Sequence, residues 1–560
     1  MKLRRIQIEN FRGIQKLDLE IGDTTVLIGE NNTGKTAVLD ALRFALRDIR
    51  SRRGCSFDAF DFHLATSSAE PTTAPAIRIT LTFREDVPGD WNDDQVARLN
   101  RAKILQADAN GAAMVILKVE AHFDTTAHDF VQDWNFLNVA GAPLNVPDTA
   151  MMTLQNEVSY YYIAALRDAA KHFDAKGTFW RPFLKESKLT PAKRTEIEAK
   201  LSEVNELIIS SHSSFSQVVS RLKEVQQVVS MVGGDDVVSV DAVPSRLFDM
   251  LAKAQVNLNT GTGAKVPVGR HGEGTQSLSV LTLFNAFLEA WNKGNPIVAL
   301  EEPEAHLHPS AVRALWQLIE RIPGQKIIST HSGDLLSEVP PDSIIRLART
   351  ATGVKAWHVS QIGLDSKQKR QFNFHIRHAR GELLFARCWI MGEGETEVTL
   401  LPEIARLMGV NLEQTGVRCV GYRQADIGLF LEIADALGIQ WTVITDNDKE
   451  GAKTIAKVQA KLNGRSECPR LQIMAEEDIE QHLCANGYGD IYEGFLNPAT
   501  QGQITVAKTD PAYWEQVAKA VKKHKIEAVQ SVIEEMRAGR PIPVLFRKTI
   551  TFATNLSKSL

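Results

Sequence analysis

The sequence predicts an α/β protein built from more than one domain. A chain of 560 residues is too long to fold around a single core. Residues 29–36 read GENNTGKT, a glycine-rich loop between a strand-like segment, TTVLI, and a helix-like segment, TAVLDALRFAL. From residue 383 onward, the strand-like segments CWIM, GVRCVGY and QWTVITD alternate with helical segments, as in a parallel sheet covered by helices.

The composition is that of a soluble globular protein, because 44% of the residues are hydrophobic and 24% are charged. The net charge of −4 gives no global sign of nucleic-acid binding, so a DNA site needs a local basic surface, such as residues 519–525. The five cysteines form no CxxC pair, which argues against structural zinc and disulfides and favours reduced thiols in the cytoplasm. The start MKLRRIQIENF does not resemble a signal peptide, and no apolar run reaches about 18 residues, so we expect no membrane contact.

The spacing of apolar residues changes along the chain. Residues 1 to about 150 alternate apolar strands with polar loops and one helix after residue 34. Between residues 190 and 230, two apolar runs with spacings of 4, 3 and 4 predict a helical hairpin with a narrow seam on each arm. The seam residues are Ile197, Leu201, Val204 and Ile208, then Val218, Leu222, Val225 and Val229. Packing of one arm on the other and dimerisation through the hairpin both remain open.

Residues 29–36 match the phosphate-loop pattern G-x-x-x-x-G-K-[ST] in the strand–turn–helix context that the pattern requires. Backbone N–H groups of such a loop wrap a phosphate at the N-terminus of a helix. We expect Lys35 to reach the β- and γ-phosphate oxygens of ATP and Thr36 to bind Mg²⁺. The expected nucleotide-binding residues of the loop are Gly29, Asn31, Asn32, Gly34, Lys35 and Thr36.

The segment PIVALEEPEAHLHP, residues 296–309, supplies the acidic strand end that a phosphate loop needs. After the buried strand IVAL, we expect Glu301 to lie just outside the metal's own ligands and Glu302 to orient the attacking water. Further along, KIISTHS places His331 at the end of another strand, where an imidazole can touch the γ-phosphate.

Together, IENFRGI, the phosphate loop, EEPEAHLHP and STHS resemble the ABC-type ATPase head of DNA-repair and chromosome-organising ATPases. Such heads dimerise around ATP, and the resemblance implies that a signature segment of one subunit covers the nucleotide of the other. The candidate segment is GEGTQS, residues 272–277, with Gly274 and Gln276 as nucleotide contacts. It departs from the usual Leu-Ser-Gly-Gly-Gln because Glu273 stands in the place of the serine.

Carboxylates gather at two further strand ends. Glu393 ends the strand RCWIM, and Glu397 lies four residues on, in the first turn of the next helix. Asp446 and Asp448 follow the strand QWTVIT. Oxygen ligands without His or Cys suit Mg²⁺ or Mn²⁺, and four carboxylates can hold two metal ions for phosphodiester cleavage. In the segment EEDIEQHL, Asp478 and Glu480 are further candidate ligands, although acidic residues there can also serve only to cap a helix.

The spacing of these carboxylates resembles the Toprim fold of topoisomerases, bacterial primases and certain nucleases, here with Gly392 in place of the usual valine. An ABC head followed by Toprim, with LFARCWIMGEGETE at the junction, resembles the OLD (overcoming lysogenization defect) family of ATP-dependent endonucleases, which includes the nuclease of the Gabija defence system. The resemblance implies a dimeric or tetrameric DNA nuclease that uses ATP and Mg²⁺ or Mn²⁺, with two metal ions in the Toprim site. It also implies a role in defence against phage and a helicase-like partner.

On this resemblance, the expected fold is an ABC-type ATPase head with an inserted helical dimerisation hairpin, followed by a Toprim α/β domain. Residues 1–165 are expected to form the N-terminal lobe of the head and residues 246–360 its C-terminal lobe. Residues 166–245 are the helical dimerisation insert between the lobes. Residues 361–382 are expected to be a polar linker, and residues 383–560 the Toprim nuclease domain.

Other enzymes with a Toprim domain fit less well, because the chain has no separate domain for a topoisomerase tyrosine and no zinc module of a primase. A DNA-organising or DNA-repair ATPase with a non-catalytic Toprim domain remains the alternative to a nuclease. The four intact carboxylates favour the nuclease.

Related OLD nucleases have a lysine near the C-terminus that opens a helix before a short proline-containing segment. Lys525, ahead of IEAVQSVIEEM and RPIP, is the best match, with Lys523 and Lys548 as alternatives and a solvated surface lysine as the simplest explanation. The expected catalytic residues are Glu393, Asp446 and Lys525 for cleavage and Glu302 and His331 for ATP hydrolysis. The expected metal ligands are Glu393, Glu397, Asp446, Asp448, Glu480 and Thr36.

Overall fold

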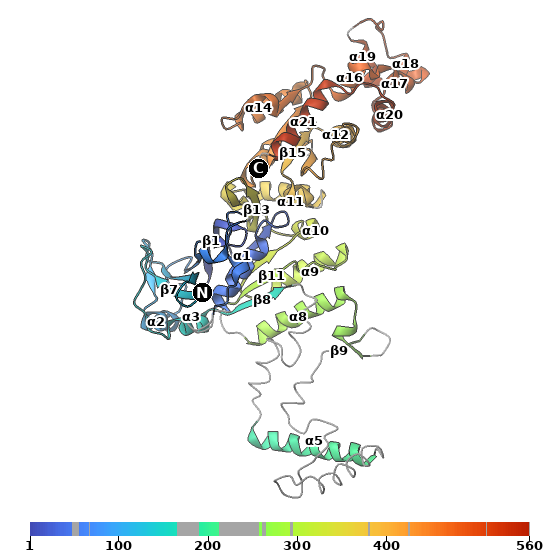
Figure 1. Cartoon of the computed structure of the whole chain (residues 1–560). Coiled ribbons are helices and arrows are strands. Elements are labelled where there is room, and N and C mark those ends of the chain that lie inside the picture. Colours follow the sequence, from blue (N-terminus) through green and yellow to red (C-terminus); the bar gives the residue numbers. More distant parts are fainter. Residues whose placement is uncertain are drawn as a thin grey trace. The chain divides into compact units, whose positions relative to one another are not determined.

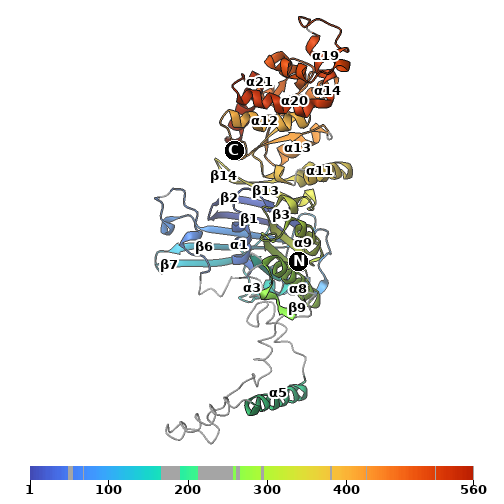
Figure 2. The same ribbon diagram turned by 90° about the vertical axis from the view of Figure 1, so that its right-hand side faces the viewer.

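The computed structural model (Figures 1 and 2) describes residues 1–47, 55–66, 68–164, 190–211, 257–259, 265–291, 295–378, 381–423, 426–510 and 512–558. The chain divides into two units. The first consists of Met1–Tyr162, Gly294–Glu304 and Gly324–Leu560, and the second of Ile163–Lys293 and Ala305–Pro323. Within the described ranges, no helix is long and apolar enough to span a membrane.

The first unit opens with an antiparallel sheet of six strands. These are β1 (Leu3–Phe11), β2 (Ile14–Glu20), β4 (Ile77–Arg84), β5 (Gln106–Ala107), β6 (Ala113–Asp124) and β7 (Asp129–Leu137). They follow the order β2-β1-β4-β6-β5, and β7 also pairs with β6 (Figure 2). Along β4, Ile79, Leu81 and Phe83 are fully buried while the residues between them are more exposed, as expected of a sheet with one face on the core.

A second sheet carries the phosphate loop and has the order β14-β13-β3-β12-β11-β8. Its strands are β3 (Thr24–Ile28), β8 (Tyr160–Ala164), β11 (Ile297–Glu301), β12 (Gln325–Ser329), β13 (Ile344–Thr350) and β14 (Gly353–His358). Strands β11, β12, β3 and β13 run parallel, so the phosphate loop, Glu301 and the residues after Ser329 emerge at one edge. This arrangement confirms the predicted ATPase-head fold.

Among the described residues up to about 150, where the sequence predicted one helix, the structure has two α-helices, α1 (Lys35–Leu46) and α2 (Asp93–Arg101), and α3 (Ala150–Glu157) follows them. The prediction missed α2 because this helix buries a single side chain, Leu99, and therefore has no apolar stripe. Its start is set locally, since the Asn92 side chain accepts a hydrogen bond from the Gln95 N–H at 2.9 Å.

In the second unit, the structure describes three helices and two short strands. They are α5 (Pro191–Ser211), β9 (Asn257–Asn259), β10 (Lys265–Pro267), α8 (Glu273–Trp291) and α9 (Pro309–Arg321). Helix α5 corresponds to the first arm of the predicted hairpin, with Leu201 buried but Val204 46% exposed. The second arm, with Val218, Leu222, Val225 and Val229, lies outside the described residues, and a role of the hairpin in dimerisation stays a prediction.

The predicted polar linker at 361–382 is for the most part a helix, α11 (Ser366–His378). On this helix Phe372 is buried, at 3% exposed. Lys369 on the same helix pairs with Asp342, which adds a second attachment. That residues 361–382 link two domains stays a prediction.

The C-terminal part of the first unit is a four-stranded parallel sheet with the order β16-β15-β17-β18. Its strands are β15 (Cys388–Gly392), β16 (Val417–Gly421), β17 (Gln440–Thr445) and β18 (Leu471–Ile473). Helices α12 (Glu395–Leu407), α13 (Ile427–Ala436), α14 (Lys449–Ala460), α16 (Ile479–Leu483), α20 (Lys525–Arg537) and α21 (Val544–Lys558) surround it (Figure 1). Because all the strands are parallel, the carboxyl ends of β15 and β17 meet at one edge, as the Toprim prediction requires.

The side chains of two arginines join this domain to the second sheet. Arg346 of β13, only 2% exposed, donates to Leu437 O at 2.8 Å and to Ala386 O at 2.9 Å. Arg387, the residue before β15, donates to both carboxylate oxygens of Glu30 in the phosphate loop at 2.5 Å. The phosphate loop and the first Toprim strand are therefore held in direct contact.

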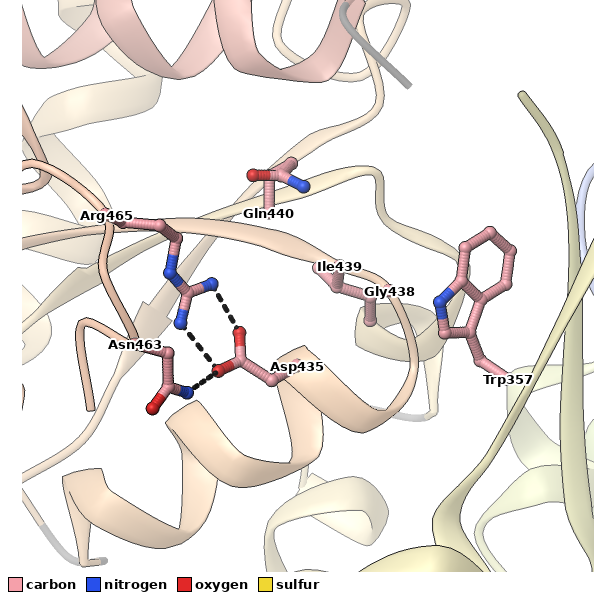
Figure 3. Close-up of a pocket in the computed structure, with 7 residues that line it drawn as sticks. All are labelled: Trp357, Asp435, Gly438, Ile439, Gln440, Asn463 and Arg465. Atoms are coloured by element: carbon pink, nitrogen blue, oxygen red, sulfur yellow. Dashed lines mark hydrogen bonds and ion pairs between the residues drawn. The ribbon is translucent and has the colours of Figure 1, made fainter. Parts of the chain in front are cut away.

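Trp357 of β14 covers Gly438 at the same junction, where a Cβ would lie 2.3 Å from the indole. Figure 3 shows the pocket of about 420 Å³ beside this contact. Its acidic residue, Asp435, is satisfied by Arg465 at 2.7 Å and by the Trp441 indole N–H at 2.9 Å. We therefore interpret the pocket as part of the junction.

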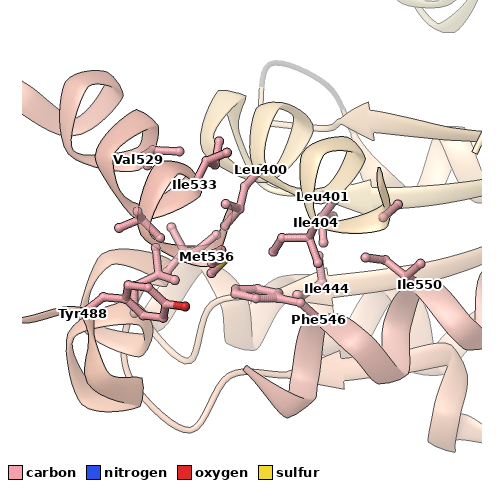
Figure 4. Packing of buried hydrophobic residues seen from close by; sticks show 14 of the residues in the cluster. Leu400, Leu401, Ile404, Ile444, Tyr488, Val529, Ile533, Met536, Phe546 and Ile550 are labelled. Carbon is pink, nitrogen blue, oxygen red and sulfur yellow. The ribbon is translucent and has the colours of Figure 1, made fainter. Parts of the chain in front are cut away.

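The Toprim core lies between its sheet and helices α12, α20 and α21 (Figure 4). Phe546 of α21 is fully buried among residues that include Leu400, Ile404 and Ile444. Because α21 packs on both β15 and β17, its apolar face keeps the two strand ends that carry the carboxylates in place.

We expect Phe546→Ala to lower the free energy of unfolding by about 3–5 kcal/mol, because it removes a buried ring and leaves a cavity. Val544→Ala, on the same helix at a position 52% exposed, is the matched control and should change stability by about 0.5 kcal/mol or less. Urea denaturation measures both. A loss below about 1 kcal/mol for Phe546→Ala would contradict the described packing.

Candidate functional site

The phosphate loop has a conformation that only glycine accommodates at two points. Gly29 has φ +147°, and a Cβ there would lie 2.1 Å from Leu347 O. Gly34 has φ +98° and immediately precedes α1, so the first N–H groups of the helix face the loop. The described geometry is therefore that of an anion site at a helix N-terminus.

Lys35 bonds to the carbonyl oxygens of its own loop. Its Nζ donates to Gly29 O and Glu30 O, each at 2.8 Å. Burial lowers the pKa of Lys35 to about 8, although Glu302 and Glu30 oppose the shift. A buried ammonium group bound only to carbonyl oxygens is well placed to exchange them for phosphate oxygens.

The acidic strand end meets the start of α1. The Thr36 hydroxyl donates to Glu301 Oε1 at 2.5 Å, and the Tyr162 hydroxyl donates to Glu301 Oε2 at 2.6 Å. Burial and the Glu301 carboxylate raise the pKa of Tyr162. The sequence analysis did not assign Tyr162 to this site, because only the pairing of β8 with β11 brings it there.

Glu302 and His331 also lie together. His331 Nε2 is 3.6 Å from Glu302 Oε1. Burial and the nearby Lys35 lower the pKa of His331, which favours its neutral form. Glu302 has φ +43°, a conformation that is uncommon for residues other than glycine and is often found at functional sites.

The candidate signature segment begins helix α8 in the second unit, as expected. The Gln276 side chain donates to His271 O at 2.6 Å, and Glu273 lies 3.2 Å from His306. A Cβ at Gly274 would lie 3.4 Å from the Leu307 side chain, so this position is close to its neighbours. The nucleotide contacts of Gly274 and Gln276 across a dimer stay predictions.

At the edge of the Toprim sheet, the parallel pairing of β15 with β17 brings Glu393, after β15, close to Asp446, after β17. Burial and the neighbouring carboxylates, Glu393 first among them, raise the pKa of Asp446 to about 9. Burial also raises the pKa of Glu393 and of Glu397, again with help from neighbouring acids. The ionised forms of these carboxyl groups therefore repel one another.

Glu397 is held close to β15. It is 2% exposed, and its Oε2 accepts a hydrogen bond from the Gly394 N–H at 3.0 Å. A Cβ at Gly392 would lie 2.5 Å from the Glu397 Cβ. Glycine in place of the usual valine therefore makes room for Glu397.

Asp448 and Asp478 each cap a helix. At the start of α14, Asp448 accepts a hydrogen bond from the Gly451 N–H at 2.7 Å. At the start of α16, Asp478 accepts a hydrogen bond from the Gln481 N–H at 2.8 Å. For Asp478, helix capping accounts for the acidic residue, as the simpler alternative predicted. Asp448 has a second carboxylate oxygen that is not used in this cap.

Lys525 lies at this acidic edge. Its Nζ is 2.8 Å from Glu480 Oε2, and the Glu480 side chain is only 3% exposed. Lys525 is the first residue of α20, as the sequence predicted. The ion pair joins two residues that the sequence analysis had selected for separate reasons.

The donor set suits a divalent cation. Asp446 Oδ1 and Glu480 Oε1 are buried and have no hydrogen-bond partner. In the described part of the chain, no group of three or more His, Cys, Asp or Glu side chains is arranged to hold a metal ion. Oxygen donors with excess negative charge favour Mg²⁺ or Mn²⁺ over softer metals.

Residues 1–382 match a family described as "Protein of unknown function (DUF2813)". The match covers more than half of the chain. The chain belongs to this family. In addition, residues 384–448 of this DUF2813 chain match the "Overcoming lysogenization defect protein-like, TOPRIM domain".

The DUF2813 chain is similar to three curated proteins over most of their length. It is 28% identical to "Uncharacterized protein YbjD" of Escherichia coli over 98% of both chains. It is 25% identical to "OLD nuclease" of Thermus scotoductus, over 80% of this chain and 82% of the relative. It is 24% identical to "Endonuclease GajA" of Bacillus cereus, over 86% of this chain and 82% of the relative. These matches confirm the resemblance to the OLD family.

From the raised pKa of Asp446 we predict how the stability of this DUF2813 chain depends on pH. An unfolded Asp has a pKa of about 3.9. Between about pH 4 and pH 9 the folded chain retains a proton that the unfolded chain releases, so the free energy of unfolding falls as pH rises. With EDTA at pH 8, Asp446→Asn should therefore be more stable than the wild type by about 1 kcal/mol or more.

Urea denaturation at pH 6 and pH 8, with EDTA or Mg²⁺, measures this difference. Mg²⁺ should stabilise the wild type but not Asp446→Asn. Asp426→Asn is the matched control: although burial opposes the shift, Lys457 and the Gly428 N–H lower the pKa of Asp426, so this variant should not gain stability at pH 8. Equal stability of Asp446→Asn and the wild type at pH 8 would contradict the charge repulsion described for this edge.

Proposed function

We propose that this chain is an ATP-binding, metal-dependent DNA endonuclease regulated by its ATPase head. The observation that carries the proposal is the convergence of Glu393 and Asp446 at the ends of two parallel strands. The names of two relatives, "OLD nuclease" and "Endonuclease GajA", support the same activity. The match to the Toprim domain supports it as well.

In this proposal, the Toprim edge binds the metal and the scissile phosphate. Its metal ligands are Glu393, Glu397, Asp446, Asp448 and Glu480. Two bound Mg²⁺ or Mn²⁺ ions stabilise charge on the attacking and leaving oxygens of a phosphodiester. Lys525 adds a positive charge beside Glu480, where it can stabilise the transition state.

The head binds ATP through the phosphate loop, with Gly29, Asn31, Asn32 and Gly34 around the phosphates and Lys35 and Thr36 as direct contacts. Glu301 holds Thr36, Glu302 orients the attacking water, and His331 contacts the γ-phosphate. Gly274 and Gln276 complete the site from a second subunit. The chain thus acts as a dimer or tetramer, with the 190–230 hairpin as one contact between copies.

The substrate in this proposal is phage or plasmid DNA, and the protein acts in the cytoplasm in defence against phage, beside a helicase-like partner. The relatives' names and the absence of a membrane-spanning helix among the described residues are consistent with this role. A DNA-organising ATPase with a non-catalytic Toprim domain is the alternative that the following experiment excludes or supports.

We expect the purified full-length chain to nick or cut supercoiled and linear DNA with Mg²⁺ or Mn²⁺, assayed with and without ATP. Glu393→Ala and Asp446→Ala should each lower cleavage by about 100-fold or more, because each removes a metal ligand. ATP hydrolysis should remain close to that of the wild type, since the nucleotide site lies elsewhere in the chain. Asp510→Ala, an exposed acidic residue of the same domain, is the matched control.

Loss of both activities in a folded Asp446→Ala variant would contradict this division between the two sites. A wild type that hydrolyses ATP and binds DNA but never cleaves it would support the non-catalytic alternative.

Lys525→Ala should lower the cleavage rate by about two orders of magnitude, the usual effect of losing one charge contact in a transition state. DNA affinity should fall much less, because a single phosphate contact is a small share of binding. Lys523→Ala, an exposed lysine of the same basic run, is the matched control and should cleave normally. Wild-type cleavage by Lys525→Ala, or equal losses of binding and cleavage, would make Lys525 a surface or DNA-docking residue.

A further inference from the structure

A carboxylate that the sequence analysis did not assign lies beside the nucleotide site. Glu304 follows the acidic strand end by two residues, and three donors converge on its Oε1. They are the Thr330 hydroxyl at 2.6 Å, the His331 N–H at 3.0 Å and the Ser332 N–H at 3.2 Å. The other oxygen, Oε2, is buried and has no hydrogen-bond partner.

These bonds fix the turn that carries His331. The turn lies between Ser329, the last residue of β12, and α10 (Gly333–Leu336). Without Glu304, the His331 and Ser332 N–H groups lose the acceptor that Glu304 provides, so the backbone at His331 would be less constrained. Glu304 thus acts on the backbone that places the His331 imidazole 3.6 Å from Glu302.

The same segment fixes Glu302. The Glu302 N–H donates to Ser329 O at 2.9 Å, and Pro303, which is buried, separates Glu302 from Glu304. Because a proline ring restricts the backbone, the two glutamates cannot reorient independently. One short segment therefore presents Glu302 to the nucleotide site and Glu304 to the turn that bears His331.

We propose that Glu304 is a positioning residue for ATP hydrolysis, which holds His331 and Glu302 in the geometry that the reaction needs. The proposal rests on the ATPase activity proposed above. Glu304 does not touch the nucleotide in this account. Its effect passes through the backbone of residues 330–332.

Two substitutions of Glu304 test whether its hydrogen bonds to the turn, rather than its charge, support the reaction. Glu304→Ala removes the acceptor of all three hydrogen bonds. Glu304→Gln keeps a carbonyl oxygen that can accept them, and it replaces the unpartnered Oε2 with an amide group. The second variant therefore retains the proposed role without the charge.

Steady-state ATP hydrolysis by the full-length chain tests the proposal. Glu304→Ala should lower kcat by about 10- to 100-fold, the scale of a small misplacement of a catalytic group, with KM for ATP nearly unchanged. Glu304→Gln should stay within about threefold of the wild type. Glu320→Ala, an exposed glutamate of α9, is the matched control and should behave as the wild type.

A double-mutant cycle separates positioning from general damage. Because Glu304 acts through His331, the Glu304→Ala/His331→Ala double variant should be no slower than His331→Ala alone. Multiplied losses in the double variant, an unchanged kcat in Glu304→Ala, or a Glu304→Gln variant as slow as Glu304→Ala would overturn the proposal. A wild type that binds ATP without hydrolysing it would overturn the proposed ATPase activity itself, and with it this role.

Discussion

The repulsion between Glu393 and Asp446 is the constraint on which the Toprim edge depends. At close range, two half-buried carboxyl groups each disfavour the ionised form of the other unless a positive charge compensates. Their strands are nonetheless held in register by parallel pairing and by α21, which packs on both. In the proposed function, a bound divalent cation would relieve this repulsion. Lys525 supplies part of the compensation through Glu480.

In the nucleotide site, the buried charge is positive rather than negative. Lys35 is a buried cation that donates to two carbonyl oxygens, and phosphate would satisfy it better. Arg387 pairs with Glu30, the residue after Gly29, and lowers its pKa. Arg387 immediately precedes β15, the strand that Glu393 follows. An ion pair therefore connects the loop that binds phosphate with the strand that ends at the Toprim carboxylates.

Much of the fold could be predicted from the sequence because its signals are local. The phosphate loop, the acidic strand end and the four Toprim carboxylates follow apolar strands, and parallel pairing makes their neighbourhood predictable. Tyr162 and Glu304 could not be assigned because their partners, Glu301 and Thr330, are distant in sequence. Helix α11 could not be assigned because the segment is polar in composition, although Phe372 on it is buried.

Binding of Mn²⁺ to the nucleotide-free, full-length chain tests the central claim most directly. Without nucleotide, the phosphate loop lacks the phosphate oxygens that complete its metal site, so tight binding reports on the Toprim carboxylates. The account predicts about two Mn²⁺ ions per chain, lost in Asp446→Ala and retained in Asp510→Ala. A wild type that binds no Mn²⁺, or an Asp446→Ala variant that binds Mn²⁺ as the wild type does, would contradict it.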